Sequence, residues 1–137
     1  MQTLFVYSDG GAINYPGPAG IGIVICDSEG KVLKKISEYI GETTNNQAEY
    51  QAVIKALEIA LSIFKADQVR CFLDSELIVE QLNMRYKVKN HGLQPLFLKA
   101  HNLAVEIGDV KFSYIPREQN KEADKLVKTA IKQGAQK

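Results

Sequence analysis

This sequence of 137 residues lacks the features that identify membrane proteins, secreted proteins and repeat proteins. No apolar run approaches the roughly 20 residues of a membrane-spanning helix, and the first residues carry no basic segment of the kind found in secretory signals. There is no internal repeat, low-complexity tract or linker rich in proline, glycine or serine. We therefore expect a single cytoplasmic domain over residues 1–137, long enough to bury a core and without a membrane partner.

Cysteine is scarce, and neither sign of charge dominates. The two cysteines, Cys26 and Cys71, both lie within apolar runs. This placement favours buried free thiols in a reducing compartment, and a disulfide is the alternative. Formal net charge is only +1, which excludes the broad basic field of proteins that bind nucleic acid indiscriminately. Any nucleic-acid site must therefore be a local surface.

The first third of the chain has the composition of strands joined by short turns. Asp9-Gly10-Gly11 is expected to end the first strand, and residues 27–30 are expected to form a hairpin turn. Three sequential strands connected in this way make an antiparallel meander. These strands are expected over residues 3–8, 20–26 and 31–40.

A helical period replaces the strand pattern at Ala48 and continues to Phe64. Asn46 followed three residues later by Glu49 fits a capping box, which would place the Glu49 carboxylate in the first turn of this helix. The rest of the pattern predicts a strand over 68–73, helices over 75–84 and 93–106, a strand over 110–115 and a helix over 120–132.

The expected order of elements along the chain is therefore βββαβααβα. Strands that follow the meander through helical crossovers add to the sheet in parallel. This order predicts an α/β fold with a mixed five-stranded sheet and helices on both faces.

Four acidic residues stand where this fold could bring them together. Asp9 and Asp74 end apolar runs, while Glu49 and Asp124 lie in the first turns of predicted helices. Crowded carboxylates repel one another unless a cation lies among them, and Mg²⁺ prefers oxygen ligands. Two such ions about 3.5–4 Å apart can hold both the attacking and the leaving oxygen of a phosphoryl displacement. Each acid alone is typical of a turn or a helix cap, but together they predict a divalent metal site.

Hydrogen-bonding side chains precede one of these acids, in the run Thr43-Thr44-Asn45-Asn46. Asparagine both donates and accepts, as contacts with minor-groove base edges and 2′-hydroxyl groups require. The run therefore suggests that the metal site handles a nucleic acid. Helix capping is the alternative for Asn45 and Asn46.

Four blocks of the sequence resemble those of type 1 ribonuclease H, and the resemblance covers essentially the whole chain. The block TTNNQAEY is the specific one, because TTNNxxE before a helix is rare, whereas Asp-Gly-Gly and Asp-Ser are common. The resemblance implies a ribonuclease H-like fold and an endoribonuclease that hydrolyses the RNA strand of RNA/DNA hybrids. It also implies two Mg²⁺ ions, for which Mn²⁺ could substitute, and products with 3′-hydroxyl and 5′-phosphate ends. The blocks are YSDGG (7–11), TTNNQAEY (43–50), FLDSE (72–76) and REQNKEAD (117–124).

The same resemblance assigns roles to individual residues. Thr44 is expected to meet a phosphate of the DNA strand, and Asn45 and Asn46 to meet the minor groove of the hybrid. The catalytic and metal-binding set is Asp9, Glu49, Asp74 and Asp124, and the substrate-binding set adds Gly10, Gly11 and Asn14 to Thr44, Asn45 and Asn46.

The sequence departs from the family pattern near the third and fourth acids. Many members have Gln at the position of Glu76, so Glu76 either points away from the phosphates or alters substrate preference. Several members carry a His before the last acid, and none is present between residues 110 and 124. Arg117 or Glu118 could act there instead, with Asn120 shaping the turn; a solvated charge pair is the alternative.

The segment between the third and fourth acids is short and lacks the basic protrusion of longer members. Its loop alternates Arg85, Lys87, Lys89 and His91. Lys87 and Lys89 could offer a reduced basic surface to the DNA strand, or the loop could simply be solvated. Some relatives without the protrusion also cut double-stranded RNA, which is a second possible substrate. No dimerisation stripe is visible, so we expect a monomer.

Two other functions fit the residues less well. A 3′–5′ exonuclease of the same general fold typically has Asp-x-Glu in its first strand, and Gly11 occupies the position of that Glu. A module that binds hybrid or double-stranded RNA without catalysis would be expected to have lost one of the four acids, and all four are present.

Overall fold

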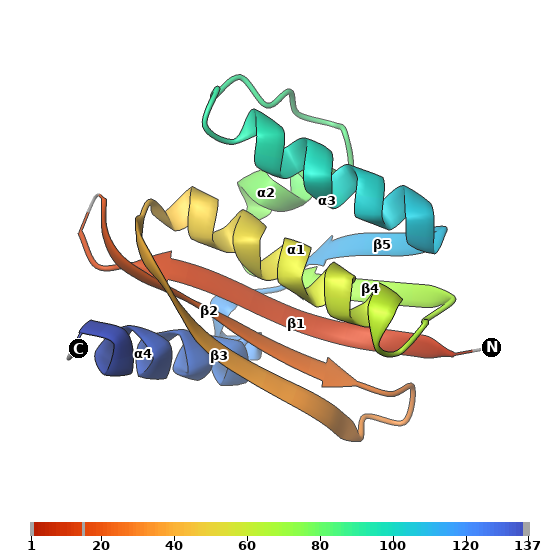
Figure 1. Ribbon diagram of the computed structural model, residues 1–137. Coiled ribbons are helices and arrows are strands. Elements are labelled where there is room, and N and C mark those ends of the chain that lie inside the picture. Colours follow the sequence, from red (N-terminus) through yellow and green to blue (C-terminus); the bar gives the residue numbers. More distant parts are fainter. Residues whose placement is uncertain (1, 15, 136–137) are drawn as a thin grey trace.

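The computed structural model describes residues 2–14 and 16–135 (Figure 1). The predicted order of helices and strands is confirmed, with a one-turn 3-10 helix added before the last helix. The elements are β1 (Thr3–Ala12), β2 (Gly17–Cys26), β3 (Val32–Thr43), α1 (Asn45–Ser62), β4 (Gln68–Leu73), α2 (Glu76–Leu82), α3 (Gln94–Ile107), β5 (Asp109–Tyr114), η1 (Arg117–Gln119) and α4 (Lys121–Ala135).

The five strands form one mixed sheet with the order β3-β2-β1-β4-β5. β1, β2 and β3 pair as the predicted antiparallel meander, and β4 and β5 add in parallel beside β1. The hairpin turn between β2 and β3 is also confirmed. Asp27 Oδ1 accepts hydrogen bonds from the backbone N–H groups of Glu29 and Lys31, each 2.9 Å long. Gly30 supplies the positive φ of +86° that the turn requires.

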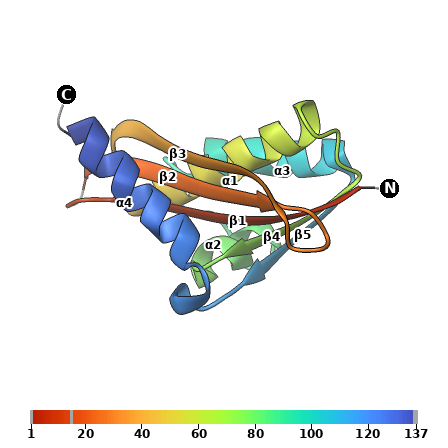
Figure 2. The ribbon, with the colours of Figure 1, turned by 90° about the horizontal axis from the view of Figure 1, so that it is seen from below.

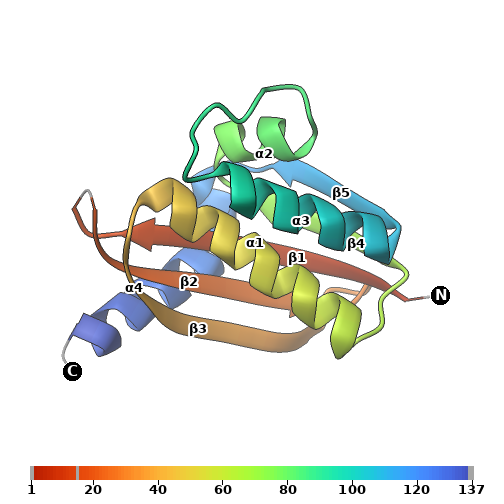
Figure 3. The same cartoon turned by 45° about the horizontal axis from the view of Figure 1, so that its top comes forward.

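Helices cover both faces of the sheet, as predicted. α1, α2 and α3 lie on one face, with α1 and α3 side by side (Figure 3). α4 lies alone on the opposite face, packed across β2 and β3 (Figure 2). Among the described residues, no helix combines the length and apolar character needed to cross a membrane.

The main core lies between the sheet and α1. Alternate residues of the central strands, such as Leu4, Val6 and Ile23, are fully buried against apolar residues of α1 such as Val53 and Leu57. Burying a side chain of this size stabilises the fold by about 1.5–3 kcal/mol. This core fixes the position of β1 relative to α1 and so determines which side chains of the strand face the helix.

The prediction that Asp9-Gly10-Gly11 ends the first strand is wrong. β1 continues to Ala12, with Asp9 paired to Gly22 and Gly10 paired to Ile21 of β2. Gly10 does not form a turn but lets the backbones of β1 and α1 approach closely. A Cβ at this position would lie 2.3 Å from the carbonyl carbon of Ala48 in α1. On the other face, a Cβ at Gly22 would lie 2.1 Å from the carbonyl oxygen of Ala123 in α4. Glycine therefore lets both helices approach the sheet beside Asp9.

The start of α1 also differs from the prediction. The helix begins at Asn45, and Thr44 is its N-cap. Thr44 Oγ1 accepts a hydrogen bond of 3.2 Å from the Gln47 N–H, and Gln47 Oε1 accepts one of 3.4 Å from the Thr44 N–H. The capping box is thus Thr44–Gln47 and not Asn46–Glu49, so Glu49 lies beyond the first turn. The sequence holds two overlapping capping patterns, and the earlier one forms.

Candidate functional site

Three acidic side chains from three elements converge at one end of the sheet. Asp9 comes from β1, Glu49 from α1, and Asp74 from the residue directly after β4. One carboxylate oxygen from each lies within 4.8 Å of the others. Parallel pairing of β1 with β4 brings Asp9 and Asp74 together, and the close approach at Gly10 adds Glu49. The predicted juxtaposition of these three acids is therefore present in the fold.

Burial and mutual repulsion disfavour the ionised forms of these acids when no cation is present. Burial raises the pKa of Asp9 to about 7; the hydrogen bond with Glu49 opposes this shift, and the charges of Asp74 and Asp124 add to it. Burial, and then the charge of Asp9, raise the pKa of Glu49 well above its ordinary value. Burial also raises the pKa of Asp74, against a hydrogen bond from Asn120 that lowers it.

The residues present fit a hard divalent cation. All three donors are carboxylates, the ligand type that Mg²⁺ and similar ions prefer. Glu49 Oε2 is buried and has no hydrogen-bond partner among the described residues. A buried carboxylate oxygen without a partner is costly, and a bound cation would supply the missing interaction.

Asn120 holds Asp74 in place, a contact that the sequence does not predict. Its side chain is 2% exposed, and its Nδ2 donates hydrogen bonds to Asp74 Oδ2 at 3.2 Å and to the Ser8 carbonyl oxygen at 2.9 Å. This one amide joins the segment before α4 to β1 and to the acid after β4. An Asn directly before a helix suggests a cap or a turn, so the sequence gives no signal for a contact with Asp74, 46 residues away.

Asp124 lies at the margin of the acid cluster. It stands in the first turn of α4, as predicted, and its charge acts on both Asp9 and Asp74. It does not belong to the group of three acids whose oxygens lie within 4.8 Å of one another, as far as the described residues show. Its Oδ2 lies instead 3.0 Å from Lys128 Nζ.

The polar run before Glu49 lies at the N-terminus of α1, next to the acids. Thr44 uses its hydroxyl group for the helix cap. Asn45 is exposed, and its Oδ1 accepts a hydrogen bond of 2.7 Å from the Ala12 N–H. This contact ties the end of β1 to the start of α1 and fixes the orientation of the Asn45 side chain. Asn46 is half-buried in the first turn.

The glycine and asparagine residues of the predicted substrate set lie around β1. Gly10 and Gly11 belong to the strand itself, and a Cβ at Gly11 would lie 3.8 Å from Asn45 Oδ1. Asn14 follows the strand, is exposed, and has the left-handed φ of +70°. Gly10 and Gly11 thus adjoin the acids and Asn45, while Asn14 belongs to the loop beyond them.

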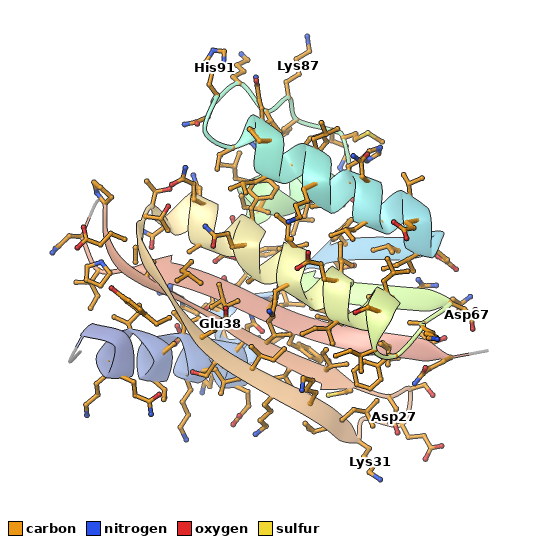
Figure 4. The ribbon with its side chains drawn as sticks, in the orientation of Figure 1. Asp27, Lys31, Glu38, Asp67, Lys87 and His91 are labelled. Atoms are coloured by element: carbon orange, nitrogen blue, oxygen red, sulfur yellow. The ribbon has the colours of Figure 1, made fainter. Side chains whose placement is uncertain are left out.

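The accessory residues fall into two groups. Arg117 and Glu118 are exposed in η1, and the charge of Arg117 lowers the pKa of Asp74. Lys87 and Lys89 are exposed in the loop between α2 and α3, and Figure 4 shows Lys87 extending outward from it. Arg85, from the same loop, is engaged by Glu80 through contacts of 2.8 and 2.5 Å.

Glu76, the departure from the family pattern, is the exposed first residue of α2. The segment from the third acid to α3 contains α2 and a loop, and no further helix among the described residues. The region that is a basic protrusion in longer members is thus reduced to this loop.

Comparison with known proteins finds relatives of similar sequence and similar fold. Residues 7–130 match the family described as reverse transcriptase-like. LC11-RNase H1, isolated from compost by a metagenomic approach, is 45% identical with a TM-score of 0.91, and the match covers 98% of this chain and 99% of that one. LC11-RNase H1 has also been crystallised in complex with an RNA/DNA hybrid. RNase H1 of the halophilic archaeon Halobacterium salinarum is 33% identical with a TM-score of 0.92, covering 96% and 98%.

A bifunctional protein of Mycobacterium tuberculosis is 36% identical over 136 residues. That match covers 98% of this chain and 37% of the relative, so the chain spans little more than a third of that relative's length. The matches to LC11-RNase H1 and the Halobacterium enzyme, in contrast, span nearly the whole of both chains. The chain belongs to the type 1 ribonuclease H family.

Proposed function

We propose that this chain is an endoribonuclease that hydrolyses the RNA strand of RNA/DNA hybrids. The observation that carries the proposal is the convergence of Asp9, Glu49 and Asp74 within 4.8 Å, beside the polar start of α1. The 45% identity to LC11-RNase H1, which binds an RNA/DNA hybrid in its crystal, supports the substrate class.

We propose that Asp9, Glu49, Asp74 and Asp124 hold two Mg²⁺ ions, for which Mn²⁺ can substitute. When bound, such ions supply activation of water for attack on the scissile phosphorus and stabilisation of the departing 3′-oxygen, which leaves 3′-hydroxyl and 5′-phosphate ends. The raised pKa values of Asp9, Glu49 and Asp74 support a cation-dependent site, because burial and then mutual repulsion disfavour their ionised forms.

The chain's own residues orient the acids and the RNA strand. Asn120 fixes the Asp74 carboxylate through its bond of 3.2 Å. We expect Glu49 to contact both a bound cation and the 2′-hydroxyl group that distinguishes RNA from DNA. Arg117 supplies a positive charge close to Asp74, on the side where related enzymes carry a His.

The start of α1 would read the minor groove of the hybrid. Because Asn45 Oδ1 is occupied by the Ala12 N–H, its amide Nδ2 is the group left to donate to base or ribose acceptors. The Thr44 hydroxyl is used by the helix cap, so a phosphate contact at Thr44 would share that group. Lys87 and Lys89 would add phosphate contacts on the DNA strand.

We further propose a monomer located in the cytoplasm. The monomer is supported by the convergence of three acids from one chain, which assembles this cluster without a second copy. The buried free thiols of Cys26 and Cys71 suit a reducing compartment.

A cleavage assay on a panel of labelled duplexes tests the proposed function. Hybrid, double-stranded RNA and double-stranded DNA would be incubated with Mg²⁺ and separately with Mn²⁺, with Asp74→Asn as the inactive control. We expect internal cuts in the RNA strand of the hybrid, absent in the variant and absent with EDTA. Comparable cutting of double-stranded RNA would widen the substrate class. Tight hybrid binding without cleavage under either metal would contradict the enzyme proposal and support a binding module.

A further inference from the structure

The fourth acid differs from the other three in its partner. Asp124 Oδ2 lies 3.0 Å from Lys128 Nζ, one helical turn further along α4. The Asp124 side chain is 22% exposed and that of Lys128 is 76% exposed. Among the described residues, no comparable ion pair involves Asp9, Glu49 or Asp74. These three carboxylates lie close to one another, and Asp74 also accepts a hydrogen bond from Asn120.

The geometry of α4 explains this pairing. Residues four apart lie on the same side of a helix, and an acid that precedes a base by four positions forms the favourable arrangement. The first turn of α4 is fixed beside the sheet at Gly22, so Asp124 faces the acid cluster while Lys128 reaches back to it from solvent. The Lys128 ammonium is thus in direct contact with one of the four acids.

A carboxylate oxygen that contacts an ammonium group is less available to a divalent cation. Both partners compete for the same lone pairs, and the positive charge of Lys128 also repels a cation approaching Asp124. The three acids that converge within 4.8 Å form no such ion pair among the described residues, although the charge of Arg117 acts on Asp74.

We propose that Lys128 is an internal counter-ion of the metal centre, which holds Asp124 when no metal is bound and which a divalent cation must displace before Asp124 can ligate it. The inference rests on the proposed metal-dependent function and deepens it. Lys128 is a positioning residue, and its effect falls on the ion that Asp124 shares. Cation binding that involved only Asp9, Glu49 and Asp74 would be affected less.

A metal titration without nucleic acid tests this inference. Binding of Mn²⁺ to the whole chain would be followed by calorimetry and by the rise in melting temperature, for the wild type and for Lys128→Met. Because exposed ion pairs contribute roughly 0.2–1 kcal/mol, we expect the Mn²⁺ midpoint of the weaker site to fall by a factor of about 1.4 to 5. Lys128→Arg, which keeps the charge and the pair, should stay near the wild type.

Two further variants separate the pair from general charge. Lys125→Met removes the same charge from an exposed residue of α4 that has no ion pair among the described residues, and it should shift the midpoint less. In Asp124→Asn, the addition of Lys128→Met should produce no further decrease. Equal shifts for Lys128→Met and Lys125→Met would overturn the counter-ion role, since net charge alone would then explain both.

The outcomes also separate this inference from the proposed function. Absence of Mn²⁺ binding by the wild type would overturn both. A lysine-dependent midpoint in a protein that fails to cleave hybrid would support the counter-ion role and contradict the nuclease proposal alone.

Discussion

At the scale of single residues, Asn120 connects the backbone of β1 to the Asp74 carboxylate. Asn120→Ala removes both hydrogen bonds and leaves the Asp74 side chain free to rotate. Because the partners that orient metal ligands typically contribute 10–100-fold to affinity or activity, we expect kcat to fall by about that factor. KM for hybrid should change little, since Asn120 is buried and contacts no substrate surface.

The exposed neighbour Gln119→Ala is the matched control for Asn120→Ala. Steady-state kinetics at saturating Mg²⁺ would measure both variants. A fall in kcat/KM caused only by KM would contradict the positioning role of Asn120.

Asp9 gives a prediction about pH. The pKa of Asp9 is raised from 3.8 to about 7 in the folded chain, so between these values the folded state binds more protons than the unfolded state. The contribution of Asp9 to stability is therefore lost as pH rises through this window. In EDTA, we expect the melting temperature to fall between about pH 4 and pH 7, and Asp9→Asn to reduce that fall.

The same reasoning predicts that Asp9→Asn is more stable than the wild type at pH 8 without metal, because a buried charge is removed from a repulsive cluster. Adding Mg²⁺ should raise the melting temperature of the wild type more than that of the variant. If Asp9→Asn without metal melts at a lower temperature than the wild type at pH 8, charge repulsion at Asp9 does not destabilise the metal-free fold.

At the scale of elements, glycine in β1 determines how closely α1 approaches the sheet. A Cβ at Gly10 would lie 2.3 Å from the Ala48 carbonyl carbon, whereas one at Gly11 meets nothing closer than 3.5 Å. Gly10→Ala must displace the backbone of α1 and with it Glu49. We therefore expect the free energy of unfolding to fall by about 1–3 kcal/mol. Urea denaturation of Gly10→Ala beside Gly11→Ala checks this, and equal losses would contradict it.

The elements also show how far sequence patterns reach. β4 occupies Gln68–Leu73, the predicted range. A short apolar run that follows a helix is well explained by a strand, so the prediction is straightforward here. Asp9-Gly10-Gly11 misleads, because a glycine required for close packing looks the same in sequence as one required for a turn. The predicted start of α1 is too late because two capping patterns overlap there.

The candidate site is predictable in its acids and less so in their support. Asp9, Glu49 and Asp74 follow from the ends of apolar runs, from the start of a helix and from the family blocks, and they converge as expected. The bond from Asn120 to Asp74 and the pair of Asp124 with Lys128 depend on tertiary packing and on side-chain conformation. Neither has a local pattern that would reveal it.

At the scale of the whole molecule, the proposed contacts with the DNA strand lie on the loop between α2 and α3, where Lys87 and Lys89 are exposed. Lys87 projects from the loop between α2 and α3, while Lys31 lies at the hairpin between β2 and β3, at the opposite end of the molecule (Figure 4). If Lys87 and Lys89 neutralise phosphates, replacing both with Ala should weaken hybrid binding. The salt slope of binding should then decrease by about 0.7–0.9 for each phosphate that is no longer neutralised. Lys31→Ala, the matched control, should leave the slope unchanged.

Hybrid binding would be measured in the Asp74→Asn background between about 50 and 200 mM salt, so that cleavage does not interfere. An unchanged salt slope in the variant that lacks both lysines would show that Lys87 and Lys89 contact solvent and not the phosphates of the hybrid.

The most direct test of a metal-dependent nuclease is cleavage of a hybrid whose RNA strand carries a 5′ label, by the wild type and by Asp74→Asn, in Mg²⁺ and in EDTA. We predict internal RNA fragments with 3′-hydroxyl ends for the wild type in Mg²⁺ alone. We predict no fragments for the variant, because one of the three convergent carboxylates is replaced. Cleavage that persists in EDTA, or that Asp74→Asn retains at the wild-type rate, would contradict a metal-dependent site built on these acids.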